Sequence, residues 1–303
     1  MKSILPTALF TAALLLLLPL SAEAAKKKCK CNKDQKLRAN ARLTLTEAEQ
    51  AAAIAQHLPW GYPTSPANTA HEHRLIQQYY IIHYDDDLRT PIWTAYHLEE
   101  DIVDNKLSRC DCFRADPRLI KAVRSTTTDY TEPIYDRGHM APSAAFKADS
   151  LAMFNTYMMS NMAPQHDNFN RDIWRFFEEY VRDWTKEYGQ VWVITGAVFD
   201  HDGNGQRDGD NTVPRMESKN GKQRVGVATH FYKILTRKDE DGNPEIMAIL
   251  LPHDDIEEKK ADAPAYLEQH IVPVDDIEAV TGIDFFPSLE VEESKKAVWW
   301  PVE

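Results

Sequence analysis

The sequence predicts an α+β fold in which helices pack on a central antiparallel β-sheet. Stretches with the apolar and β-branched composition of strands recur along the 303 residues, whereas clearly helical stretches are few. Two of these strand-like stretches are separated only by a short turn. Apolar residues make up 43% of the chain and charged residues 27%, as in ordinary soluble globular proteins. The length suffices for one large domain or two small ones.

Residues 1–25 have the three parts of a secretory signal peptide. Lys2 lies in a short basic start, residues 8–20 are apolar, and Ala22-Glu23-Ala24 is an A-x-A cleavage site. A membrane anchor is the alternative, but an apolar run of about 13 residues is too short to span a bilayer. We therefore expect cleavage near Ala24 or Ala25, export to the periplasm or the exterior, and no association with a membrane.

The four cysteines form two Cys-x-Cys pairs, Cys29 with Cys31 and Cys110 with Cys112. Four thiolates are a possible zinc site, although paired zinc ligands are usually separated by two residues or more. An exported protein meets oxidising conditions, which favours disulfides. We predict two disulfides between the two segments, with the pairing left open.

Residues 26–70 are predicted to be an N-terminal arm, and residues 71–303 the main domain. Residues 26–45 are basic and polar, which indicates an extended segment. Thr46 and Glu49 form a capping box that begins a helix ending near His57. Residues 59–70 are rich in Pro, Gly and Asn and are expected to form a surface loop.

The main domain begins with two strands that enclose a turn at residues 85–91 and are followed by a charged loop at residues 98–116. Another strand is predicted after residue 189, and two more near residues 225–237 and 246–252. A short helix before Gly282 closes the pattern. The predicted bounds are Tyr79–Tyr84, Ile92–Leu98 and Gln190–Phe199 for three of the strands and Val274–Thr281 for the helix.

A helix is predicted to begin near Asn168 or Asn170 and to end at Gly189. At about 100° per residue, an apolar stripe lies within roughly 60° of Asn170, with Glu178 at its edge. Polar groups that face a core need partners, so an amide and a carboxylate on one side suggest a hydrated divalent cation. The alternative is that both bond to the backbone or to Arg182. The stripe consists of Ile173, Trp174, Phe177, Val181 and Trp184.

Three sequence motifs lie in and before this helix. They are Asp-Arg-Gly-His at 136–139, Asn-x-x-Pro-Gln at 161–165 and, within the helix, Asn-x₃-Trp-x₃-Glu at 170–178. With these spacings, the region resembles the DNA/RNA non-specific endonuclease family, whose members carry a ββα-metal finger. The resemblance extends weakly over residues 75–290. It implies an enzyme that hydrolyses DNA and RNA without sequence preference and uses Mg²⁺, which Mn²⁺ can replace; export is expected from the signal peptide.

The resemblance also implies roles for individual residues. His139 is expected to be the general base, since an imidazole with a pKa of about 6.5 is mostly neutral at pH 7. Asn170 is expected to be the direct protein ligand of Mg²⁺, an ion that often keeps most of its waters. Glu178 would orient water in the outer shell of that ion.

Other residues of the three segments are expected to support the site. Asn161 would position either the histidine or the phosphate, and Arg137 would contact phosphate. Asp136 is expected to hold the hairpin by hydrogen bonding. Trp174 and Gln165 are interpreted as packing or loop residues.

One position departs from the family pattern. Some members carry a second catalytic arginine on the strand that ends Trp-x-Ala-Tyr, where this chain has His97. The sequence leaves three possibilities open: His97 binds phosphate itself, Arg89 or Arg182 takes the arginine's place, or turnover is lower.

Residues 200–208 resemble the start of a calcium-binding loop. Oxygen-bearing side chains occupy loop positions 1, 3, 5 and 9, a glycine stands at position 6, and position 7 offers a backbone carbonyl. Position 12 has Asn211 in place of the usual Glu, and the alternative is a solvated acidic loop. The predicted ligands of a structural Ca²⁺ are Asp200, Asp202, Asn204, Gln206 and Asp208.

The net charge of −12 is unusual for a protein that binds a polyanion. Contact with DNA or RNA must therefore come from a local basic surface and a metal. The acidity and His97 keep a second hypothesis open, a nuclease-like domain with a structural or binding role. A third is a phosphodiesterase for small nucleotides. The oligomeric state does not follow from the sequence.

Overall fold

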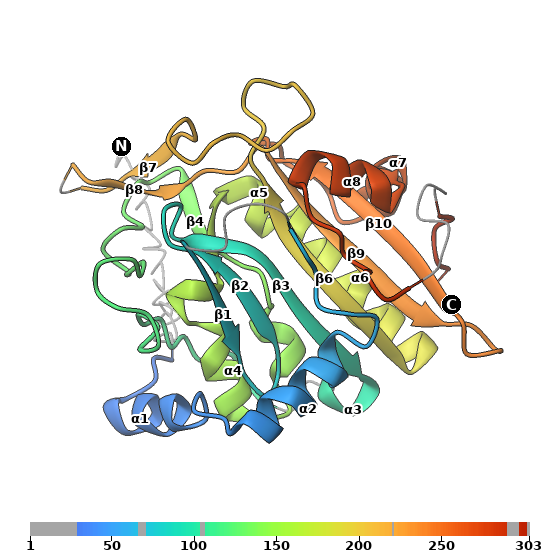
Figure 1. Cartoon of the computed structure of the whole chain (residues 1–303), viewed down its shortest axis with the longest axis horizontal. Helices are drawn as coiled ribbons and strands as arrows, with labels where there is room; N and C mark the ends of the chain where they lie inside the picture. Colours follow the sequence, from blue (N-terminus) through green and yellow to red (C-terminus); the bar gives the residue numbers. More distant parts are fainter. Residues whose placement is uncertain (1–28, 66–70, 104–106, 220, 290–296, 302–303) are drawn as a thin grey trace, which may run out of the picture.

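The computed structural model describes residues 29–65, 71–103, 107–219, 221–289 and 297–301. The predicted signal peptide lies outside these residues. Seven strands form one antiparallel sheet, in the order β1-β2-β3-β6-β9-β10-β11 (Figure 1), which confirms the predicted fold class. The strands are β1 (Glu72–Ile76), β2 (Ile81–Asp85), β3 (Thr90–Glu99), β6 (Gln190–Val198), β9 (His230–Lys238), β10 (Pro244–Pro252) and β11 (Ile271–Val272).

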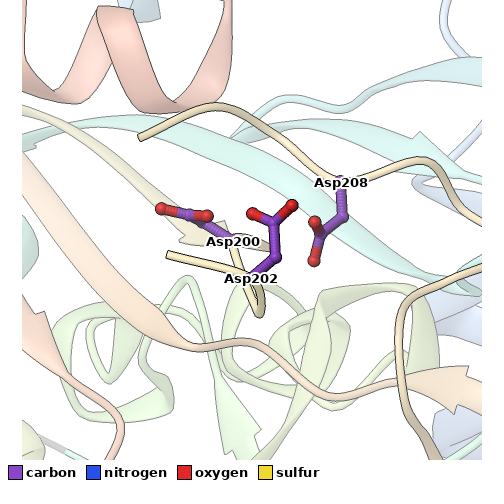
Figure 2. A group of neighbouring side chains, drawn as sticks. All are labelled: Asp200, Asp202 and Asp208. Carbon is purple, nitrogen blue, oxygen red and sulfur yellow. The ribbon is translucent and has the colours of Figure 1, made fainter. Parts of the chain in front are cut away.

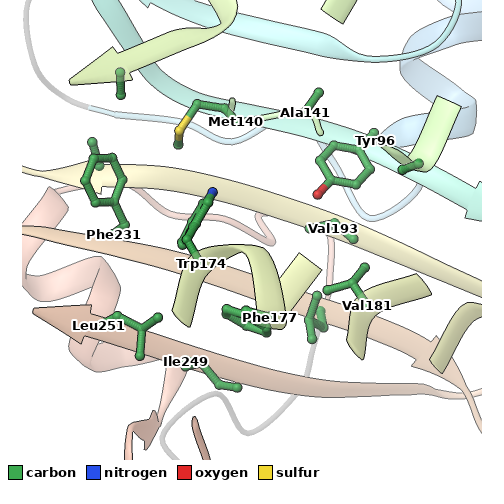
Figure 3. Packing of buried hydrophobic residues seen from close by; sticks show 14 of the residues in the cluster. Tyr96, Met140, Ala141, Trp174, Phe177, Val181, Val193, Phe231, Ile249 and Leu251 are labelled. Carbon is green, nitrogen blue, oxygen red and sulfur yellow. The ribbon is translucent and has the colours of Figure 1, made fainter. Parts of the chain in front are cut away.

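The central strands are buried on both faces, because helices cover both sides of the sheet. Side chains of a strand alternate between faces, so Tyr96 and Val193 point to one layer and Ala95 and Ile194 to the other. The first layer holds α6 (Ile173–Tyr188) and α7 (Ala263–Gln269), and the second holds α2 (Glu47–His57) and α8 (Val274–Thr281). In Figure 3, Trp174, Phe177 and Val181 of α6 pack against Val193, Phe231, Ile249 and Leu251 of the sheet.

The apolar stripe of the predicted long helix is confirmed, since all five of its residues are buried. The prediction of one continuous helix is wrong. A short helix, α5 (Asp167–Arg171), ends where Asp172 adopts φ −111° and ψ −96°, and α6 begins at the next residue. The spacing of apolar residues could not reveal this break, because a single non-helical residue, Asp172, separates two helices that bury the same side. Gly189 ends α6 as predicted, at φ 77°.

The ββα arrangement that the resemblance implies is present. Strands β4 (Tyr135–His139) and β5 (Met162–His166) pair antiparallel, and α5 and α6 follow directly. The connection between the strands contains the 3₁₀ helices η2 (Ser143–Phe146) and η3 (Met159–Asn161) and the helix α4 (Ser150–Thr156). Gly138 is required for space, because a Cβ there would lie 2.1 Å from Oε1 of Gln165 on the paired strand.

The prediction of an extended segment at residues 26–45 is wrong for its second half. Helix α1 (Lys33–Ala41) begins with a capping box, in which the Asn32 and Gln35 side chains each accept a hydrogen bond from the other's backbone N–H. The capping box of Thr46 begins α2 as predicted. The predicted charged loop contains the short helix α3 (Glu100–Val103), and a separate hairpin is formed by β7 (Arg215–Glu217) and β8 (Gln223–Gly226).

Two disulfides join the Cys-x-Cys segments, Cys29 to Cys110 and Cys31 to Cys112. The disulfide prediction is confirmed, and no cysteine in the described residues is left for zinc. Between the two bonds, the Cys31 N–H donates to the Asp111 carbonyl and the Asp111 N–H to the Cys29 carbonyl, each over 3.0 Å. Elsewhere in the described chain, no helix has the length and apolarity needed to cross a bilayer.

Candidate active site

His139 is the last residue of β4 and lies opposite Met162 of β5. Its carbonyl accepts a hydrogen bond from Nε1 of Trp174, over 3.2 Å, which ties the strand to α6. The ring centroid lies 4.8 Å from that of Tyr157 and 5.9 Å from that of Phe113. Nε2 is enclosed and has no hydrogen-bonding partner among the described residues. The aromatic walls thus fix the ring while leaving this nitrogen uncommitted.

Asn161 holds the segment that follows His139. Its Oδ1 accepts from the Ala141 N–H over 2.9 Å, and its Nδ2 donates to the carbonyls of Ala141 and Thr156 over 2.9 and 2.8 Å. The side chain is completely buried. Of the two roles predicted for Asn161, the geometry supports positioning the histidine segment, since its polar atoms are already used and do not reach a phosphate.

Asn170 and Asp136 meet between the hairpin and α5. Nδ2 of Asn170 donates to Oδ2 of Asp136 over 3.0 Å, and Arg171 donates twice to the same carboxylate over 2.8 and 3.0 Å. Asp136 therefore holds the hairpin, as predicted. With Nδ2 engaged, Oδ1 is the atom of the Asn170 amide that could serve a cation as a ligand.

Glu178 lies in the second turn of α6 and interacts electrostatically with the buried Lys233 of β9. Nζ of Lys233 lies 3.8 Å from the ring centroid of Trp174 and 3.3 Å from Oγ1 of Thr195. Burial raises the pKa of the Glu178 carboxyl, while the Lys233 ammonium, with Arg182 and Arg109, acts in the opposite direction. Burial is the larger cause, and the pKa of Glu178 is raised to about 7.

Arg109 is a residue that the sequence reasoning missed. It acts electrostatically on both His139 and Glu178, and its guanidinium carbon lies 5.7 Å from the Tyr157 ring centroid. Nε of Arg109 donates to Oδ1 of Asp111 over 2.9 Å. Burial, and secondly the Arg109 charge, lower the pKa of His139 to about 3. The sequence did offer one signal for Arg109: it precedes Cys110, and a disulfide at that cysteine fixes the loop that carries the arginine.

The three residues considered for the missing arginine lie in different places. His97 stacks on Trp192, with centroids 4.2 Å apart, on the sheet face away from Tyr96 and α6. The hypothesis that His97 contacts phosphate is therefore wrong. Arg182 donates to the Glu178 carbonyl over 2.8 Å, and Arg89 donates to the carbonyls of Ala122 and Arg124.

Arg137 precedes His139 by two residues and lies on the same face of β4. Its guanidinium carbon is 4.4 Å from the Phe113 ring centroid, and the side chain is partly exposed. Gln165 is fully buried beneath Gly138, and Trp174 is buried in the core, which confirms their packing roles.

The donors present fit a hard divalent cation. The amide oxygen of Asn170 and the carboxylate of Glu178 are the oxygen ligands that Mg²⁺ prefers. The cluster of described His, Cys, Asp and Glu residues close enough to hold a metal by themselves lies elsewhere, at residues 200–208. A magnesium ion at the candidate site would therefore be held by few protein atoms.

The residues 200–208 bring three of the five predicted calcium ligands together. Carboxylate oxygens of Asp200, Asp202 and Asp208 lie within 4.8 Å of one another (Figure 2). Oδ1 of Asn204 instead accepts from the Gln206 N–H over 2.8 Å, and its Nδ2 donates to Asp202 over 2.9 Å. The Asn204 side chain thus faces its own loop in this conformation.

Comparison with known proteins agrees with these features. The profile of the DNA/RNA non-specific endonuclease family matches residues 61–292. Human mitochondrial endonuclease G is 31% identical over 220 residues, which cover 69% of this chain and 68% of the relative. Nuclease C1 of Cunninghamella echinulata var. echinulata is 34% identical over 224 residues, covering 72% and 84%. A solved structure of the EndoG/EndoGI complex matches with a TM-score of 0.65 and 29% identity, over 82% of this chain and 95% of that one.

Proposed function

Because the chain belongs to the DNA/RNA non-specific endonuclease family, we propose that it is an exported endonuclease that cleaves DNA and RNA without sequence preference and depends on Mg²⁺ or Mn²⁺. Membership makes it a nuclease-family hydrolase. The observation that carries the rest of the proposal is the imidazole of His139, whose Nε2 has no hydrogen-bonding partner among the described residues, together with the guanidinium charges of Arg109 and Arg137 that act on it.

In this proposal His139 takes a proton from water, and the water oxygen attacks phosphorus. The bond from phosphorus to the 3′ oxygen then breaks, and the leaving oxygen gains a proton from solvent. Arg109 and Arg137 hold the phosphoryl oxygens, where negative charge increases in the transition state. Asn170 and Glu178 would hold the magnesium ion, whose charge, when bound, stabilises the phosphate and the leaving group.

The nuclease assay uses supercoiled plasmid and a long RNA, each with Mg²⁺, Mn²⁺ or a chelator. We expect cleavage of both substrates, none in chelator, and restored activity when the metal is returned. The variant His139→Ala should retain its circular dichroism spectrum and lose cleavage. A matched control is His71→Ala, because that histidine is largely exposed and lies outside the site. Full activity of His139→Ala would remove the base assignment.

Export is supported by the two disulfides, which form in oxidising compartments. We propose that the signal peptide is removed near Ala24 or Ala25 and that residues 71–303 form the catalytic domain, on which α1 and α2 of residues 26–70 pack. Mass spectrometry of the mature protein from a periplasmic or culture fraction tests the first point. An intact Met1 in the exported protein would contradict it.

We also propose that residues 200–208 bind a structural Ca²⁺. The proximity of the Asp200, Asp202 and Asp208 carboxylates supports this, since mutual repulsion favours a bound cation. Isothermal titration with Ca²⁺ should show a binding heat for the parent protein and a greatly reduced heat for Asp202→Ala. Equal heats would rule the site out.

A further inference from the structure

A lysine is buried between α6 and the sheet. Lys233 lies in β9 between Phe231 and Leu235, and the alternation of a strand places these three side chains on the sheet face that α6 covers. The Lys233 side chain is completely buried. Its Nζ lies 3.8 Å from the ring centroid of Trp174 and 5.7 Å from that of Phe177, two rings of α6 that Figure 3 shows facing the sheet. An ammonium group therefore occupies a place where its neighbours on the strand and on the helix are apolar.

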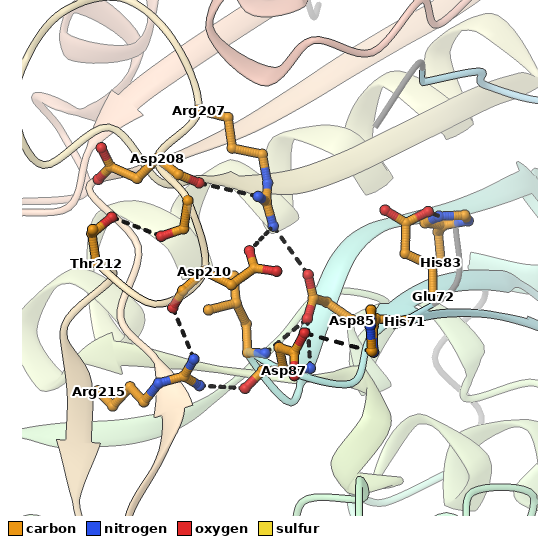
Figure 4. Close-up of polar contacts among 12 residues, drawn as sticks. His71, Glu72, His83, Asp85, Asp87, Arg207, Asp208, Asp210, Thr212 and Arg215 are labelled. Carbon is orange, nitrogen blue, oxygen red and sulfur yellow. Dashed lines mark hydrogen bonds and ion pairs between the residues drawn. The ribbon is translucent and has the colours of Figure 1, made fainter. Parts of the chain in front are cut away.

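This ammonium group has few hydrogen bonds for a buried charge. It carries three N–H donors, and within the described chain it makes one hydrogen bond, to Oγ1 of Thr195 over 3.3 Å. The buried carboxylate of Asp85, by contrast, forms a direct ion pair with Arg207 at 3.0 Å (Figure 4). An isolated ammonium in an apolar environment is costly, so the position of Lys233 requires an opposite charge nearby.

The opposite charge is that of Glu178. Trp174 and Glu178 are four residues apart in α6, so they lie on the same side of the helix, and the ammonium beside the Trp174 ring is close to both. Burial lowers the pKa of Lys233, and the charge of Glu178 acts in the opposite direction. After burial, the Lys233 charge has the largest effect on the pKa of Glu178, ahead of Arg182 and Arg109. Lys233 and Glu178 are thus each other's main electrostatic partner.

A second polar group in this layer also responds to Glu178. The Tyr96 hydroxyl is enclosed and has no hydrogen-bonding partner among the described residues. Its strand, β3, is separated from β9 by β6 alone, and the Tyr96 side chain lies in the same layer as Trp174 (Figure 3). After burial, Glu178 has the largest effect on the pKa of Tyr96. Polar groups in this otherwise apolar layer therefore gather around one carboxylate of the candidate site.

We propose that Lys233 is a positioning residue whose buried charge holds the Glu178 carboxylate in place for the metal, and that Thr195 and the Trp174 ring fix the ammonium. The inference rests on the proposed function, because it adds a support to the same site. Lys233 is completely buried, so it does not contact nucleic acid and acts through Glu178. An apolar residue would fill the same space at lower cost, which is why a charge at this position indicates a functional role.

Metal binding tests the proposal without cleavage. Mn²⁺ is titrated into the metal-free protein, and the free ion is followed by electron paramagnetic resonance. The part of the binding that Asn170→Ala removes belongs to the candidate site, which separates it from binding at residues 200–208. Lys233→Met removes the charge and should weaken Mn²⁺ binding at the site roughly tenfold, as should Glu178→Gln. The double variant should bind no more weakly than Glu178→Gln alone, because the two residues act as one unit.

The chain offers a matched control and a second variant. Lys238→Met changes an exposed lysine of the same strand, whose Nζ lies 5.4 Å from the Trp192 ring centroid on the other face of the sheet, and it should leave Mn²⁺ binding unchanged. Thr195→Val removes the oxygen that accepts from the ammonium and should weaken Mn²⁺ binding by a smaller factor. Thermal melting shows which variants fold, and Thr195→Val keeps the proposal testable if Lys233→Met does not.

Cleavage of plasmid separates positioning from substrate binding. Lys233→Met should raise the Mg²⁺ concentration for half-maximal cleavage roughly tenfold. The KM for plasmid at saturating Mg²⁺ should stay unchanged, because the buried side chain does not reach the substrate. A purely structural role would instead lower the melting temperature and leave the metal requirement as it is in the parent.

The outcomes separate this inference from the proposed function. If the parent cleaves plasmid while Lys233→Met keeps the parental Mn²⁺ affinity and Mg²⁺ requirement, the inference is wrong and the proposed function stands. If Mn²⁺ binding shows the expected losses but the parent cleaves neither DNA nor RNA, the positioning role is correct and the proposed function is wrong. If the losses of Lys233→Met and Glu178→Gln add up in the double variant, Lys233 does not act through Glu178 and the inference is overturned.

Discussion

The two disulfides make a prediction about stability that depends on their arrangement. Each bond closes a loop of the same length, since Cys29 and Cys110, and likewise Cys31 and Cys112, are separated by 81 residues. The loops nearly coincide. Once one bond has formed, the other closes only a small ring made of residues 29–31 and 110–112. Removing both should therefore cost more than twice the loss from removing one.

The magnitudes follow from loop-closure entropy. For a loop of about 80 residues the cost of losing the constraint is about 4.5 kcal/mol at 25 °C, whereas for a ring of about six residues it is about 2 kcal/mol. A single pair of variants, Cys29→Ser with Cys110→Ser, should lower the free energy of unfolding by about 2 kcal/mol. Replacing all four cysteines should lower it by about 6–7 kcal/mol. The coupling between the two bonds is then about 2–3 kcal/mol.

The assay is urea unfolding of four proteins: the parent, each disulfide removed alone, and both removed. Intrinsic tryptophan fluorescence reports on the core, where Trp174 and Trp184 are buried. Equal losses for the two single removals that add up to the double loss would refute the shared-loop reasoning. Activity provides a second measurement, because the same bonds fix Arg109; the fourfold variant should lose cleavage at urea concentrations where it is still folded.

Three further perturbations have defined outcomes. Burial lowers the pKa of His57 and of His253 from 6.5 to about 4, so between these pH values the unfolded chain binds more protons than the folded one. The free energy of unfolding should therefore be highest above pH 6.5 and fall by about 3 kcal/mol per histidine as the pH is lowered to 4. Urea midpoints measured at several pH values will show this decrease. Gly138→Ala should cost about 1–3 kcal/mol because its Cβ meets Gln165, and an unchanged midpoint would contradict this. Asp136→Asn should raise the Mg²⁺ concentration for half-maximal cleavage by roughly tenfold or more, because it weakens the anchor of Asn170; an unaltered metal requirement would contradict the orienting role.

Several elements were predictable because local signals and tertiary structure agree. Helix α8 has the predicted bounds, and its stop is Gly282 at φ 69°. The N-terminus of α2 follows from its capping box. Strand β6 is mostly apolar because both faces of the central sheet are covered, so its composition alone marks it. In each case one short stretch contains the whole reason for the structure.

The misses share a different physical cause. Helix α1 is polar, and only Ala39 of its residues is buried, so apolar periodicity gives no sign of it. The break at Asp172 changes one residue and leaves the buried stripe intact. The position of Arg109 depends on which segments the disulfides bring together. Such long-range contacts are not encoded in the spacing of neighbouring residues.

Those long-range contacts bear on the mismatch between an acidic chain and a polyanionic substrate. Arg109 comes from the loop fixed by the disulfides, and Arg137 comes from β4. Neither segment is strongly basic by itself. A positive surface formed by arginines from separate segments exists only while the fold holds those segments together, whereas a basic tail would keep its charge density in the unfolded chain. Substrate binding should therefore disappear in the same transition as the fold, which anisotropy and fluorescence recorded on one urea titration can establish.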